Sequence, residues 1–171
     1  MNLLKVVSLG GLVLLVAQVA CAVETRPAPP GPTSLEGTWT LAFADVVHPD
    51  GTRGHDYGDP PKGVLHVDRA GHYAMFIFNP GRSKFASNDK SKGTPEEYRG
   101  AIMGTSSHYG TVQMDPAAHT LTFHVDGSTY PNWEGATQVR RYTFDGDVLS
   151  YEVAARPNGD IPTTGWRRQK P

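Results

Sequence analysis

Apolar and polar residues alternate along most of the chain after Leu35. In TWTLAFADVV (Thr38–Val47), Trp39, Leu41 and Phe43 share one face, which predicts a strand with one buried side. The same period of two predicts further strands, which lie in Val64–Val67, Tyr73–Phe78, Ser107–Asp115, His119–Asp126, the two arms of Gln138–Ala154, and Gly165–Gln169.

Most of these predicted strands are joined by short turn sequences. Asp145-Gly146 stands between two alternating runs, where a two-residue hairpin turn is expected, and Asp50-Gly51 and Arg69-Ala70-Gly71 have similar turn chemistry. Eight strands in sequential hairpins can close into an antiparallel up-and-down barrel, which has no free edge and leaves an interior for one small ligand. A two-sheet sandwich would show the same alternation, but its crossing connections need longer links.

One segment between the strands has a different pattern. TPEEYRGAIMG (94–104) begins with Thr94 as a helix cap, Pro95 at the first helical position and two acidic residues in the first turn. Gly100 weakens the helix that follows. We therefore predict an all-β, eight-stranded barrel with one short helical insertion.

The first 34 residues do not have the pattern of the barrel. Residues 1–22 contain one early charge, Lys5, then an apolar run and small residues up to Ala22, the layout of a cleaved signal peptide. Residues 23–34 are rich in proline and predict an extended tether, so residues 35–171 form the folded domain. We expect an exported protein, periplasmic or secreted. An uncleaved membrane anchor and a lipid anchor on Cys21 remain alternatives.

Composition narrows the expected chemistry and partners. Cys21 is the only cysteine, so cleavage after Ala22 leaves a domain without disulfides or thiol chemistry, stabilised by its core alone. The formal net charge is −1, and loss of Lys5 makes it more negative. A chain without surplus positive charge is not expected to bind nucleic acid or to dock on anionic lipid, and we expect no membrane span in the mature chain.

The opening LEGTWTL (35–41) resembles the way in which lipocalins begin. The resemblance implies that Gly37 and Trp39 close one end of the barrel, with an arginine from GWRR (Gly165–Arg168) over the indole. Either Arg167 or Arg168 could supply that cation, and a cation over a tryptophan face is favourable by roughly 0.5–2 kcal/mol.

A more specific resemblance covers about Leu35 to Arg168. The segments YGDPPKGVLHV, TPEEYRG, HYGTVQMD and HVDGSTYPNWEGATQVRRY (124–142) are similar to the lipocalin-like domain family of bacterial and fungal proteins. The last segment matches every position of that family's His-x-x-x-Ser-x-x-Pro-Asn-Trp-x-Gly-x-x-Gln-x-Arg pattern. This resemblance implies a barrel with a cavity, and it implies no particular reaction.

The candidate ligand-contacting residues come from the same segment. Period two places Gln138, Arg140 and Tyr142 on one face, and we expect His124 to point toward the same cavity with Trp133 above them on the connecting loop. A purely structural role for this segment remains open. Sequence provides no oriented base, so we assign no catalytic residue.

The remaining chemistry gives few leads. Seven histidines are scattered without a metal-binding spacing, so we expect no metal, and no other cofactor is indicated. Three hypotheses follow: a barrel that binds a small apolar or amphipathic molecule; an isomerase, cyclase or hydrolase in which His124 and Arg140 polarise a carbonyl; or a cell-envelope module whose barrel is filled by its own side chains.

Overall fold

A computed structural model describes residues 34–145 and 147–170 of the protein. The predicted signal peptide, nearly all of the predicted tether, and Cys21 lie outside the described residues. The description that follows therefore concerns the predicted domain.

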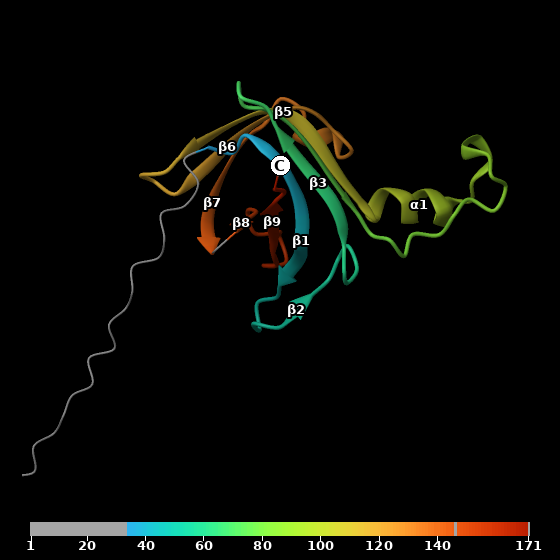
Figure 1. The fold of residues 1–171 in the computed structure, drawn as a ribbon. Coiled ribbons are helices and arrows are strands. Elements are labelled where there is room, and N and C mark those ends of the chain that lie inside the picture. Colours follow the sequence, from blue (N-terminus) through green and yellow to red (C-terminus); the bar gives the residue numbers. More distant parts are fainter. Residues whose placement is uncertain (1–33, 146, 171) are drawn as a thin grey trace, which may run out of the picture.

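The domain is built almost entirely of antiparallel strands (Figure 1). Buried and less buried positions alternate along most of them, as in KGVLHV and HYAMFIF, whose buried positions recur at every second residue. The strands are β1 (Gly37–Val47), β2 (Arg53–Gly54), β3 (Lys62–Val67), β4 (His72–Phe78), β5 (Thr105–Asp115), β6 (Thr120–Ser128), β7 (Thr137–Asp145), β8 (Val148–Glu152) and β9 (Ile161–Arg168).

Eight of these strands close into the predicted up-and-down barrel. Each strand from β3 to β9 pairs with its neighbour in the chain, and β1 pairs with both β3 and β9, so the long strands leave no free edge. The two-residue β2 only adds to the end of β1, where Val46 pairs with Gly54. The last strand is longer than the predicted Gly165–Gln169, because Ile161–Thr164 continue the pairing with β1.

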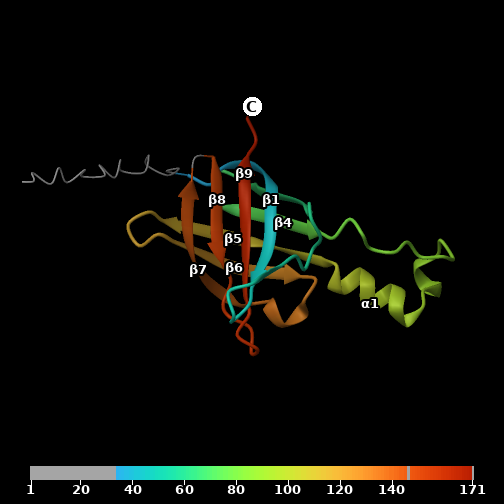
Figure 2. The ribbon, with the colours of Figure 1, turned by 90° about the horizontal axis from the view of Figure 1, so that it is seen from below.

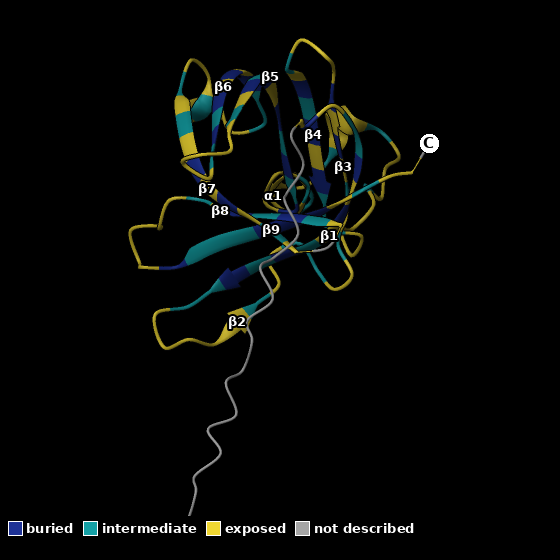
Figure 3. Cartoon of the chain, turned by 60° about the vertical axis from the view of Figure 1, so that its left-hand side comes forward, coloured by how far each residue is buried: buried dark blue, intermediate teal, exposed yellow. Residues whose placement is uncertain are grey.

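The inward-facing side chains fill one end of the barrel. Trp39, Phe123, Leu149 and Trp166 are fully buried, and Figure 3 shows buried and exposed positions alternating along the strands. Trp39 is opposite Leu65 in the β1–β3 pairing, and Leu65 is opposite Met75 in the next, so large side chains meet across neighbouring strands. This packed end of the barrel is its hydrophobic core.

The predicted helix is α1 (Pro95–Met103), which belongs to an arm outside the barrel. Thr94 accepts a hydrogen bond from the Glu97 amide and the Glu97 side chain accepts one from the Thr94 amide, the reciprocal cap that the sequence suggests. None of the helix residues is buried. Figures 1 and 2 show α1 and the preceding loop extending away from the barrel between β4 and β5.

The described residues include no helix with the length and apolar character needed to cross a membrane. Two short 3-10 turns complete the regular structure, η1 (Lys90–Lys92) in the arm and η2 (Pro131–Trp133) between β6 and β7.

Candidate ligand-binding site

A cavity of about 680 Å³ occupies the other half of the barrel and is open to solvent at its mouth. Its inner wall comes from inward-facing positions of β4, β5, β8 and β9, and its mouth from η2, the start of β7 and the loop after β8. The inner wall is largely apolar, with Met75, Ile77 and Tyr151, while Ser106 and Thr164 add hydroxyl groups. Ligand sites of small molecules have this size and this mixture of apolar walls with few polar groups.

Arg140 is the one predicted ligand residue whose charge is buried in this cavity. Its side chain lines the cavity and the residue is only 3% exposed. The guanidinium carbon lies 4.6 Å from the centre of the Phe123 ring and 5.1 Å from that of Tyr151, so two neighbouring aromatic rings contact the cation. A guanidinium nitrogen also donates a hydrogen bond to the Gln138 Oε1 atom, while Nε has no partner among the described residues.

The structure brings two more predicted residues to the cavity and leaves the other two, Tyr142 and His124, outside its lining. Gln138 and Trp133 line the mouth, where Trp133 stands edge-on to Tyr130. Tyr142 points inward as predicted, but it is the next inward position along β7 and belongs to the packed core. Its ring lies 5.7 Å from that of His119, away from the cavity lining.

The predicted inward orientation of His124 is wrong. His124 is exposed, whereas its neighbours Phe123 and Val125 are buried, so the apolar residues of β6 form the inner face. His124 is opposite Thr137 in the β6–β7 pairing, and its Nδ1 is 2.9 Å from the hydroxyl of Thr137, an exposed residue at the mouth of the cavity. The hydrophobic face of a strand enters the core because burial of apolar surface outweighs any single polar contact.

The histidine that does lie beside the cavity is His108, which the sequence does not single out. It is opposite Met75 in the β4–β5 pairing, and its Nδ1 lies 2.6 Å from the Tyr73 hydroxyl. Burial, together with the nearby Arg140 charge, lowers the pKa of His108 to about 3, so the ring is neutral at neutral pH. Burial also raises the pKa of Tyr73, so its hydroxyl stays protonated.

His108 packs against Trp133 of the segment 124–142 and against Phe123, which directly precedes that segment. Its ring stands edge-on to Trp133, with ring centres 5.8 Å apart, and edge-on to Phe123 at 6.0 Å. Its Nε2 has no hydrogen-bond partner among the described residues. The inward-facing residues around His108 on β5 are Ser106 and Gly110, and neither has a large apolar side chain. The alternation of apolar and polar residues therefore does not reveal which face of β5 is buried.

The closed end of the barrel contains the Gly-x-Trp residues. Trp39 is fully buried, and its indole nitrogen donates to the Leu35 carbonyl at 2.9 Å. The guanidinium carbon of Arg168 lies 4.3 Å from the centre of the Trp39 ring, and Gly37 takes a positive φ of 131° beside that guanidinium. Arg167, the other candidate, is exposed and pairs with Asp147.

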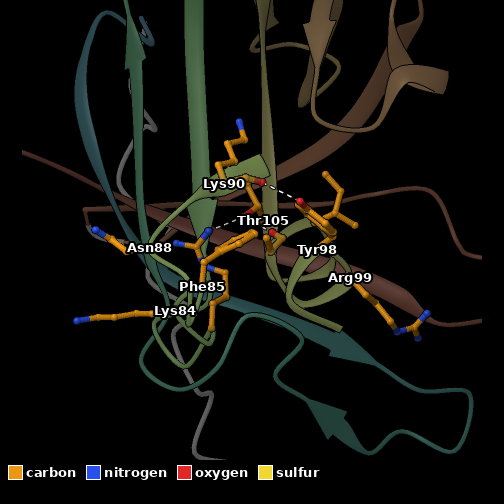
Figure 4. A pocket seen from close by; sticks show the side chains of 10 residues that line it. Lys84, Phe85, Asn88, Lys90, Tyr98, Arg99 and Thr105 are labelled. Carbon is orange, nitrogen blue, oxygen red and sulfur yellow. Dashed lines mark hydrogen bonds between the residues drawn. The ribbon is translucent and has the colours of Figure 1, made fainter. Parts of the chain in front are cut away.

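A second hollow of about 970 Å³ lies in the arm, between α1 and the loop before it (Figure 4). Phe85 and Tyr98 meet edge-on there, and the Tyr98 hydroxyl donates to the Lys90 carbonyl at 2.8 Å. All the charged residues that line it are basic: Arg82, Lys84, Lys90 and Arg99. Figure 4 shows Lys84 and Arg99 extending outward, so this hollow is an open groove separate from the barrel cavity.

The sequence pattern of the family described as "Lipocalin-like domain" matches residues 36–168. The protein therefore belongs to the lipocalin-like domain family, in agreement with its closed eight-stranded barrel. No curated protein and no solved structure is similar enough to add a named relative.

Proposed function

We propose that the protein binds a small, largely apolar molecule in the cavity beside Arg140. The observation that carries this proposal is the half-filled barrel: Trp39 and Trp166 pack one end, whereas about 680 Å³ stays open at the other. A barrel filled by its own side chains, the structural alternative, has no need of such a space. The family supports a barrel of the lipocalin type, in which small-molecule binding is the natural expectation.

The enzyme alternative gains no support from the residues on which it was based. His124 is exposed and does not line the cavity, whereas Arg140 is buried in it, so the structure does not place the two side chains together as this alternative requires. His108 is close to the cavity, but its lowered pKa makes it a poor base near neutral pH.

Binding of the neutral fluorophore Nile red tests the proposal. We expect emission to rise and shift to shorter wavelength when the dye enters the cavity. A Ser106→Phe variant should lose this signal, because the larger side chain projects from the inner wall and fills the cavity. Thr143→Phe is the matched control because Thr143 is exposed on the outer face of β7. Equal binding by both variants would contradict a site inside the barrel, provided that circular dichroism shows both to be folded.

We also propose that the protein is exported and loses residues 1–22. The support is the charge, the apolar run and the small residues of that segment. The mass of the protein isolated from its host tests this directly, because cleavage after Ala22 leaves Val23 as the first residue. A mass that includes acyl chains on Cys21 would instead support the lipid-anchored alternative.

A further inference from the structure

Within the part of the chain that the structure describes, the guanidinium of Arg140 is a buried charge without an ion-pair partner. None of the ion pairs found in residues 34–145 and 147–170 includes Arg140. The other arginine that lines the cavity, Arg156, is at the mouth and pairs with Asp56 at 2.5 Å. The cavity therefore has one neutralised cation at its rim and one uncompensated cation inside.

The groups around Arg140 are neutral. Phe123 and Tyr151 offer aromatic faces, and Gln138 offers an amide oxygen. Such contacts stabilise a cation but leave its charge in place, and a buried charge is normally matched by an opposite one. The Nε of Arg140 has no hydrogen-bond partner among the described residues, so these residues leave one donor of the guanidinium unsatisfied.

The walls next to Arg140 define the remainder of the ligand. Met75, Ile77 and Val153 are apolar, and they lie on the same cavity as the guanidinium. A molecule that fits both features has a single anionic group and an apolar body. One uncompensated positive charge matches a monoanion, and the planar fork of a guanidinium matches the two oxygens of a carboxylate.

We propose that the ligand is an amphipathic carboxylic acid, bound as its anion with the carboxylate against Arg140 and the apolar body along Met75 and Ile77. This proposal rests on the proposed binding function and specifies its ligand class. Arg140 is then the residue that selects acids over neutral molecules of the same shape.

Affinities of three matched compounds test the proposal: decanoic acid, decanol and methyl decanoate, each measured by displacement of Nile red near pH 7. We expect the acid to bind at least about 10-fold more tightly than the alcohol and the ester, because a hydrogen-bonded charge pair replaces a neutral contact. Equal affinities would overturn the carboxylate assignment and leave cavity binding intact. Failure of Nile red and all three compounds to bind would overturn both proposals.

Two neighbouring arginines provide a matched pair of variants. Arg140 faces the cavity and Arg141, the next residue of β7, is exposed. We expect Arg140→Gln to weaken decanoic acid binding by about 10-fold or more and to change decanol binding by less than about 3-fold. Arg141→Gln should change neither. A preference for the acid that survives in folded Arg140→Gln would overturn the proposal, and if that variant does not fold, the comparison of acid and alcohol in the unaltered protein decides.

Discussion

Replacement of Arg168 by alanine should destabilise the barrel at its closed end. Arg168 lies over the Trp39 ring with 4.3 Å between the guanidinium carbon and the ring centre, and it donates hydrogen bonds to the Glu36 carbonyl at 2.6 Å and to the Ser34 carbonyl. The cation over the ring contributes about 1 kcal/mol at a partly exposed position. The two hydrogen bonds add about 0.5–1 kcal/mol each, so the free energy of unfolding should fall by about 2–3 kcal/mol.

The neighbouring arginine is the control for this prediction. Arg167 pairs with Asp147, but both side chains are largely exposed, so Arg167→Ala should cost less than about 1 kcal/mol. Thermal and urea unfolding followed by circular dichroism would measure both variants. For a domain of this size, the Arg168→Ala loss corresponds to a decrease in Tm of about 5–10 °C. Equal stabilities of Arg168→Ala and Arg167→Ala would refute the role of Arg168 at the closed end.

Two other features of the structure predict measurable effects. The arm should be dispensable for folding, because no α1 residue is buried and the Asn79 amide already donates to the Gly104 carbonyl at 2.9 Å across its base. Replacement of residues 80–103 by an Asn-Gly turn should therefore leave the Tm and Nile red binding nearly unchanged. Loss of the folded barrel in this variant would contradict the prediction. Neutral burial of His108 should make stability fall as the pH drops from about 6.5 toward 3, by up to about 1.4 kcal/mol per pH unit, because only the unfolded chain takes up the proton in that range. His108→Gln should have a shallower dependence of unfolding free energy on pH, and an identical slope in both proteins would show that His108 is not the group responsible.

Alternation along the chain predicts most of the strands. The structure confirms these strands, the pairing of β7 with β8 and the capped helix after Thr94, while Gly146 of the predicted turn lies outside the described residues. The predicted buried face of β1 holds for Trp39 and Leu41 and is wrong for Phe43, because a bulge between Leu41 and Phe43 brings Ala44 and Val46 to the buried face instead. The short β2 strand was not predicted, because two residues that pair with the end of β1 have no alternating pattern of their own.

The site was only partly predictable, because inward and outward faces must be assigned strand by strand. Arg140 was placed correctly within the pattern of β7. The outward position of His124 follows from its neighbours, since Leu121, Phe123 and Val125 mark the other face of β6 as the buried one. The position of His108 was not predictable, because a register shift between Tyr109 and Gly110 and small inward residues on β5 hide the alternation.

Methionine methyl NMR tests the central claim, that the barrel cavity binds a small molecule, most directly. Met75 lines the cavity, Met103 is 63% exposed on the arm, and Met114 packs against the core. With ¹³C-methyl methionine and added Nile red, we predict that the Met75 signal shifts while the Met103 and Met114 signals stay in place. A dye that binds but moves the Met103 signal and not that of Met75 would place the site in the arm and contradict the account.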